Sequence, residues 1–227
     1  MGIHDGHRDK MRKRFQNSSL DSFAAHEALE LLLYYAIPRR DTNPIAHALI
    51  ERYGSLEAVF NASLEDLQAV EGIGESASIL LKLVPQLIRK AKLDQTKMGD
   101  TILNDSKDAG ALLMDLFEGE QVETVYELCL DKKRRLLAYR RLSSGGISLA
   151  ELNMRQLVLN AVNSAATQVI LAHNHPSGLA VPSSDDNAAT EQALSALRIV
   201  GVELVDHIII ADREFVSLRD SGFFDRF

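Results

Sequence analysis

Two histidines and an aspartate stand at a spacing that suits a bound metal ion. His173 and His175 lie two residues apart, directly after the apolar run 167–172, which we expect to be a strand. Alternate residues of a strand point the same way, so both imidazoles can face one point. Asp185 and Asp186 follow ten and eleven residues after His175, just inside an expected helix start. Zinc binds His nitrogen and carboxylate oxygen, and catalytic zinc sites commonly combine three protein ligands with one water.

The same residues also have purely structural interpretations. Ser183 stands three residues before Asp186, which is close to a helix capping box, and the helix dipole favours an aspartate there. Pro176-Ser177-Gly178 can form a tight turn without any ligand. However, packing alone hardly explains an apolar strand, a His-x-His pair, this turn and an acidic helix start in direct succession. The combination therefore favours a metal site.

The segment from His173 to Asp186 reads HNHPSGLAVPSSDD, which is His-x-His, seven residues, Ser, two residues and Asp. It resembles the JAMM (MPN+) metalloprotease motif, and its His-Asn-His-Pro-Ser-Gly start is similar to that of the bacterial RadC family. The resemblance extends over nearly the whole chain, including the helical N-terminal half. It implies one Zn²⁺ per chain. It also implies that Asp186 and not Asp185 is the third ligand, because Ser183 must precede that aspartate by three residues.

The JAMM pattern also requires an upstream glutamate that holds the metal-bound water. RadC-like chains place it in a strand of the form Glu-x-Phe-x-x-x-x-Leu-Asp, which residues 122–131, VETVYELCLD, match through their final Leu-Asp pair. This register implies Glu123 as the catalytic base, although Val125 stands where an aromatic residue is usual. Glu127 follows on the same face of the strand and is the second choice. Glu123 can alternatively be an ordinary surface residue of a strand.

The resemblance implies a hydrolytic mechanism. Zinc would lower the pKa of its bound water, and Glu123 would take the proton and pass it to the leaving amine. Ser183 would donate a hydrogen bond to the oxyanion. His207 is either a neighbour of the site on a following strand or a histidine of the core. The chain departs from RadC-like sequences at one place before the metal-binding strand, where Asn153-Met154-Arg155-Gln156 replaces the usual His-Pro-Arg-Glu. We expect this change to affect a surface that faces a substrate or a partner, and not the metal site.

The elements that must position these residues divide the chain in two. Residues 1–98 form an expected all-helical domain, and the polar segment 92–100 leads into an α/β domain at residues 99–227. The resemblance implies a JAMM/MPN-type mixed sheet covered by helices, with cytidine-deaminase-like layers. Gly145 and Gly146 mark a turn or bulge. We expect helices at 22–37, 44–53, on both sides of 72–74 (the last to about 91), 106–117, 153–165 and 184–200, and strands at 122–130, 135–142, 167–172, 202–210 and near 215.

The helical half contains a tight turn, Val70-Glu71-Gly72-Ile73-Gly74-Glu75, that resembles a helix-hairpin-helix motif for the DNA backbone. Its glycines would bring backbone N–H groups at a helix start near a phosphate. Glu71 and Glu75 would repel that phosphate, so a hairpin used for packing or for a protein partner is the alternative. We expect the nearby basic cluster to be a solvated tail and not a phosphate-binding group; it consists of Arg8, Lys10, Arg12, Lys13 and Arg14.

Composition limits the class of protein. Hydrophobic residues make up 46% and charged residues 25%, as in ordinary soluble domains. Residues 1–98 carry 13 Lys and Arg against 13 Asp and Glu, and residues 99–227 carry 12 against 19, so the second half is a poor partner for nucleic acid. The single Cys129 fits a reducing cytoplasm and a buried strand position. No apolar run or signal peptide indicates a membrane, so we expect a cytoplasmic protein.

Two functions from different classes remain. The first is a JAMM-type zinc metallopeptidase or isopeptidase with a peptide or protein substrate. The second is a DNA-associated, repair-related binding protein, contacting DNA weakly through residues 1–98, whose metal site is structural or vestigial. A zinc nucleobase deaminase is excluded, because it would need His-x-Glu and Cys-x-x-Cys and this chain has one cysteine.

Overall fold

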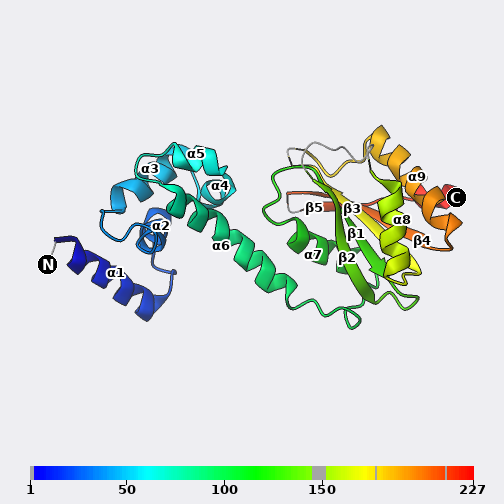
Figure 1. Cartoon of the computed structure of the whole chain (residues 1–227), viewed down its shortest axis with the longest axis horizontal. Coiled ribbons are helices and arrows are strands. Elements are labelled where there is room, and N and C mark those ends of the chain that lie inside the picture. Colours follow the sequence, from blue (N-terminus) through cyan, green and yellow to red (C-terminus); the bar gives the residue numbers. More distant parts are fainter. Residues whose placement is uncertain (1–2, 145–151, 177, 213) are drawn as a thin grey trace. The chain divides into compact units, whose positions relative to one another are not determined.

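The structure is a computed structural model that describes residues 3–144, 152–176, 178–212 and 214–227 (Figure 1). The expected turn at Gly145 and Gly146 lies outside the described residues, and so does Ser177 of the expected Pro-Ser-Gly turn. The chain divides into two compact units, Met1–Ile88 and Arg89–Phe227, which we describe separately. Among the described residues, no helix is both long enough and apolar enough to cross a membrane.

Every regular element among the described residues of the first unit is a helix, and the helix at Ile3–Ser18 is one that the expected helices did not include. Its short helices begin at well-formed caps: the side chains of Ser55 and Ser63 accept hydrogen bonds from the backbone N–H of Ala58 and Asp66. Its core is a cluster of buried Leu, Ile, Val and Ala side chains. The helices are α1 (Ile3–Ser18), α2 (Ala25–Leu33), α3 (Asn43–Tyr53), α4 (Leu56–Asn61), α5 (Leu64–Gln68) and the greater part of α6 (Glu75–Leu93).

The prediction that the basic cluster at residues 8–14 is a solvated tail is wrong for Arg8. This residue lies on α1 and is only 8% exposed. Its guanidinium donates hydrogen bonds to the backbone carbonyls of Ile37, Pro38 and Arg40, at 2.8, 2.7 and 2.5 Å. These carbonyls follow the end of α2, where no helix can satisfy them, and a guanidinium supplies several donors at once. Arg8 therefore fixes α1 to the segment after α2.

The last turn of α6 belongs to the second unit. Arg89 pairs with Glu120 at 2.7 Å, and Lys92 pairs with Glu118 at 2.7 Å. The polar segment 92–100 that we expected as the linker therefore begins inside α6, and the division between the units falls at residues 88 and 89. Ion pairs of this kind depend on residues about 30 positions apart, which a local composition change does not reveal.

The second unit is a five-stranded mixed sheet with strand order β2-β1-β3-β4-β5. Strands β3 and β4 are parallel, and all other neighbours are antiparallel. The expected mixed sheet covered by helices is confirmed. Its elements are α7 (Ser106–Phe117), β1 (Thr124–Leu130), β2 (Leu136–Ser144), α8 (Met154–Asn163), β3 (Gln168–Asn174), α9 (Ser184–Ile199), β4 (Glu203–Ala211), β5 (Glu214–Ser217) and the 3-10 turn η2 (Phe223–Arg226).

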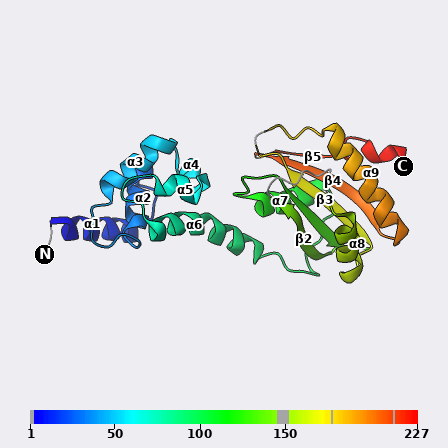
Figure 2. The same cartoon turned by 45° about the horizontal axis from the view of Figure 1, so that its top comes forward.

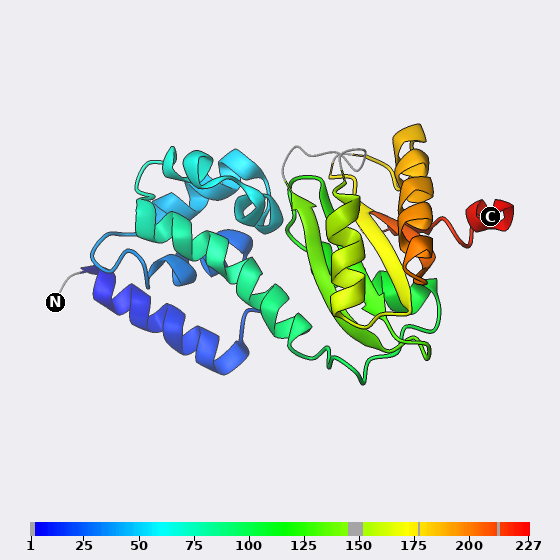
Figure 3. The same ribbon diagram turned by 45° about the vertical axis from the view of Figure 1, so that its right-hand side comes forward.

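Helices cover both faces of this sheet (Figures 2 and 3). On β3, Ile170 and Ala172 pack into the cluster that contains the α7 side chains. Val169 and Leu171 pack into the cluster that contains the α8 and α9 side chains. Because side chains alternate along a strand, His173 lies on the same side as Val169 and Leu171. The end of β3 therefore directs His173 toward the layer that contains α9.

Candidate metal centre

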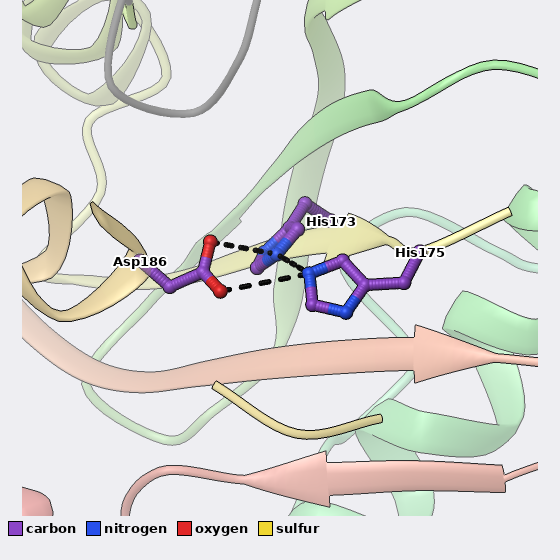
Figure 4. Close-up of side chains that lie close together, drawn as sticks. All are labelled: His173, His175 and Asp186. Atoms are coloured by element: carbon purple, nitrogen blue, oxygen red, sulfur yellow. Dashed lines mark hydrogen bonds and ion pairs between the residues drawn. The ribbon is translucent and has the colours of Figure 1, made fainter. Parts of the chain in front are cut away.

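The structure brings together the three side chains that the sequence indicates as ligands (Figure 4). His173 is near the end of β3, His175 follows directly after it, and Asp186 is the third residue of α9. His173 Nε2 lies 3.0 Å from Asp186 Oδ1 and 2.9 Å from His175 Nε2. His175 Nε2 lies 3.5 Å from Asp186 Oδ2. The neighbouring Asp185 is exposed.

These separations suit a zinc ion. Ligand atoms that lie about 2.0–2.2 Å from a tetrahedral zinc are about 3.3–3.6 Å from one another. Of the three distances in the structure, 3.5 Å lies within this range, and 2.9 and 3.0 Å are somewhat shorter. Two imidazole nitrogens and one carboxylate oxygen also form the donor set that zinc accepts, and they leave a fourth position for water. The cluster therefore fits a mononuclear site with one open coordination position.

Burial and charge make the three groups good ligands. His173 is fully buried and Asp186 is 4% exposed, whereas the side chain of His175 is 23% exposed. Burial alone would raise the pKa of Asp186, but the hydrogen bond and charge of His173 and the Ser183 donors outweigh it. The pKa of Asp186 is therefore held well below its usual range, and the carboxylate stays anionic. The exposure at His175 places the open side of the centre there.

The second ring nitrogens of both histidines have protein partners. His175 Nδ1 lies 3.0 Å from the carbonyl oxygen of Leu179. His173 Nδ1 lies 2.8 Å from His207 Nε2, and His207 Nδ1 lies 2.6 Å from Thr190 Oγ1. Burial lowers the pKa of His207 well below its usual value, so this imidazole is neutral. His207 is thus both a buried histidine and a neighbour of the site, and Thr190 is a residue that sequence reasoning missed.

Asn174, between the two histidines, was also missed. Its side chain is nearly buried and bonds to the backbone of the neighbouring chain segment. Asn174 Oδ1 accepts from the N–H of Thr124 at 2.8 Å, and Asn174 Nδ2 donates to the carbonyl of Val122 at 3.2 Å. The residue between these two bonds is Glu123. Asn174 therefore holds the backbone on both sides of the expected base; an asparagine inside a buried strand was the available signal.

The strand register places the two glutamates differently. Val125 is paired with His173, and Glu127 with Leu171. Continuing this register by two residues brings Glu123, which is half-buried, opposite His175. Glu127 is instead fully buried beside the apolar cluster under α8, where it accepts a hydrogen bond from Asn160 at 2.9 Å. The register therefore favours Glu123 over the second choice.

The environment of Glu127 raises its pKa to about 7, because burial disfavours the charged form and the hydrogen bond from Asn160 only partly compensates. The segment 153–156, which departs from the pattern of RadC-like sequences, is connected to the carboxylate of Glu127 by hydrogen bonds. Asn153 caps α8 by accepting from the N–H of Gln156, and Gln156 Nε2 donates to Asn160 Oδ1 at 2.7 Å. The departing residues thus stabilise α8 and connect to Glu127.

Ser183 occupies the N-cap of α9. Its hydroxyl donates to Asp186 Oδ2 at 2.8 Å and accepts from the N–H of Asp186 at 3.1 Å, and its own N–H donates to Asp186 Oδ2 at 2.7 Å. The capping box is therefore present together with the histidine cluster. Cys129 is buried, as expected, and burial raises its pKa to about 12, which excludes a reactive thiolate.

Comparison with known proteins adds two findings. Residues 103–223 match the model of the RadC-like JAB domain, a range that contains all three residues of the cluster and both glutamates. The UPF0758 protein FN0909 of Fusobacterium nucleatum is 34% identical to this chain over 223 residues, which is 96% of each of the two chains. The similarity to this relative therefore includes the helical unit as well as the sheet.

Proposed function

The chain belongs to the RadC family of JAB-domain proteins, and we propose that it is a zinc-dependent hydrolase of peptide or isopeptide bonds. The observation that carries this proposal is the convergence of His173, His175 and Asp186, with ligand atoms 2.9–3.5 Å apart. A purely structural role would not require two imidazole nitrogens to face each other beside a carboxylate at a partly exposed edge. The exposure at His175 supports access for a substrate.

Each side chain in and around the cluster has a different role in the proposed hydrolysis. His173, His175 and Asp186 would hold the zinc ion, which when bound lowers the pKa of a coordinated water from about 15.7 toward about 7. Glu123 accepts the proton of the attacking water and delivers it to the leaving amine. Ser183 lies next to the cluster and donates its hydroxyl to the oxyanion once that hydroxyl turns away from Asp186, a contribution of about 3 kcal/mol.

Zinc content tests the proposal directly. Wild-type protein is expected to carry about one zinc per chain after dialysis, and His173→Ala is expected to carry almost none, because two ligands hold zinc far more weakly than three. Asp185→Ala is the matched control, since Asp185 is the exposed neighbour of Asp186 and its variant should keep the zinc. Elemental analysis measures all three. A wild-type zinc content no higher than that of His173→Ala would refute the proposal.

One observation in the helical unit favours a second activity, weak DNA binding through residues 1–98. The tight turn between α5 and α6 contains Gly72, whose φ of +93° only glycine adopts easily. The exposed Arg40 brings its guanidinium Nη1 to 3.8 Å from the position that a Cβ of Gly72 would take. A cation thus lies beside the turn, although the turn itself contains none and has Glu71 and Glu75 on its flanks.

The DNA-binding proposal makes a modest prediction. We expect duplex DNA to bind with a Kd of about 10⁻⁵ M near physiological salt, more tightly at low salt, and we expect Arg40→Ala to weaken binding several-fold. Fluorescence anisotropy with labelled duplex at two salt concentrations measures this. Arg198→Ala, an exposed arginine of the sheet unit, is the control. Absence of binding even at low salt would contradict the DNA-binding proposal and leave packing or a protein partner as the role of the turn.

A further inference from the structure

We propose that Thr190 and His207 are positioning residues that hold His173 in the neutral tautomer whose lone pair, on Nε2, faces the proposed metal site. The inference rests on the metal centre of the proposed function and deepens it. It depends on a chain of three hydrogen bonds that begins at the backbone carbonyl of Asp186. These bonds pass through Thr190 and His207 and end at His173.

The direction of the first bond is fixed by chemistry. Thr190 Oγ1 lies 2.6 Å from the carbonyl oxygen of Asp186, four residues earlier in α9, and 2.6 Å from His207 Nδ1. A carbonyl oxygen carries no hydrogen, so the hydroxyl must donate to it, as threonines inside helices commonly do. A hydroxyl has only one proton. Toward His207 it can therefore only accept, and His207 Nδ1 must be the nitrogen that carries a hydrogen.

The second and third directions follow from the first. His207 is fully buried, and a buried imidazole without an acidic partner is neutral, with one protonated nitrogen. Since that nitrogen is Nδ1, His207 Nε2 offers a lone pair, and it lies 2.8 Å from His173 Nδ1. His173 Nδ1 must then donate. In neutral His173 the lone pair is therefore on Nε2, the atom that faces His175 Nε2 and Asp186 Oδ1, where it can bind a metal ion; without the metal this nitrogen can carry the hydrogen that it donates to Asp186.

The chain of bonds joins two of the three proposed ligands to each other. It begins at the backbone of Asp186 in α9, crosses to β4 and reaches β3, where His173 faces the carboxylate of the same Asp186. The parallel pairing of β3 and β4 makes this possible, because His207 is paired with Leu171 and lies on the same side as His173. His175 needs no such relay, since the carbonyl of Leu179 accepts from its Nδ1 directly.

Zinc affinity of the full-length chain tests the inference without any activity assay. Thr190→Val keeps the shape of the side chain but removes the acceptor for His207 Nδ1, so His207 no longer fixes its own tautomer or that of His173. We expect zinc affinity to fall 10–100-fold, the range typical for lost partners of metal ligands. Thr190→Ser keeps the hydroxyl and is the matched control; its affinity should stay within about threefold of wild type. Competition with a chromogenic zinc chelator gives all three values.

A second measurement needs no variant. Long-range ¹H–¹⁵N spectra of the zinc-free wild-type protein report which ring nitrogen of each histidine carries hydrogen, and we expect Nδ1–H at both His173 and His207. An Nδ1 without hydrogen at either residue would overturn the inference, as would zinc binding by Thr190→Val that is as tight as wild type. Wild-type protein that binds no zinc would instead refute the proposed function, and the tautomers would still be measurable. The two failures are therefore distinguishable.

Discussion

Replacement of Glu123 by glutamine is expected to lower the rate of peptide cleavage about a thousandfold while the zinc content stays near one per chain. Positioned proton transfer typically contributes factors of about 10²–10⁴, and a glutamine amide cannot accept the proton of the water. Because Glu123 is not among the proposed ligands, its loss should not release the metal. The value of kcat/KM, measured on the best peptide from a cleavage screen, and elemental analysis of the same sample give both parts of the result.

Glu127→Gln is the matched control for this experiment, because it makes the same chemical change four residues further along the chain, inside β1. Glu127 is bonded to Asn160 beside the apolar cluster under α8, so its replacement should leave cleavage close to wild type. If Glu127→Gln lost cleavage and Glu123→Gln retained it, the assignment of the base from the strand register would be wrong. Loss of zinc from Glu123→Gln would equally contradict a role limited to proton transfer.

The same Glu127→Gln chain is expected to be more stable than wild type at high pH. Burial raises the pKa of Glu127 from an ordinary value near 4.5 to about 7. The folded state therefore binds more protons than the unfolded state between these pH values, and the wild-type free energy of unfolding falls as the pH rises through this window. A difference of about 2.5 pKa units corresponds to about 3 kcal/mol, present in full above pH 7 and absent below about pH 4.

Urea unfolding of both chains at pH 4.5 and pH 8 measures this effect. The difference between the chains should be small at pH 4.5, where residue 127 is neutral in both folded chains and Glu127 of the unfolded wild type is only about half ionised, and about 3 kcal/mol in favour of Glu127→Gln at pH 8. Comparing the chains at each pH removes the contribution of every other titrating group. Glu214→Gln, at an exposed position on β5, should show no such pH dependence. Equal stability of wild type and Glu127→Gln at pH 8 would contradict the burial argument.

Much of the candidate site could be predicted from sequence because its proposed ligands lie close together in the chain. His173, His175 and Asp186 lie within 14 residues, and the apolar strand and the acidic helix start that carry them are both local patterns. The two interpretations of Ser183 and Asp186 proved compatible, since one carboxylate oxygen accepts from the helix cap while the other faces His173.

The residues around the ligands could not be predicted in the same way. His207 and Thr190 reach the site only through the register of β3 against β4 and the packing of α9, which no local spacing encodes. The prediction for Arg8 was wrong for the same reason. Its hydrogen-bond acceptors lie about 30 residues away in the chain, and the local run of basic residues by itself is typical of a solvated tail. Contacts between side chains that are far apart in the sequence depend on tertiary geometry, whereas local periodicity indicates only helices and strands.

The amide of Asn174 has a mechanical consequence for the site. Its two hydrogen bonds hold the backbone at Val122 and Thr124, so the end of β1 cannot slide along β3 without breaking both at once. Shear between these strands would otherwise change the distance from Glu123 to the metal-bound water of the proposed mechanism. We expect this attachment to make the histidines and Glu123 move together when the end of the sheet fluctuates. The geometry that the proposed mechanism requires would then change mainly when these two hydrogen bonds break.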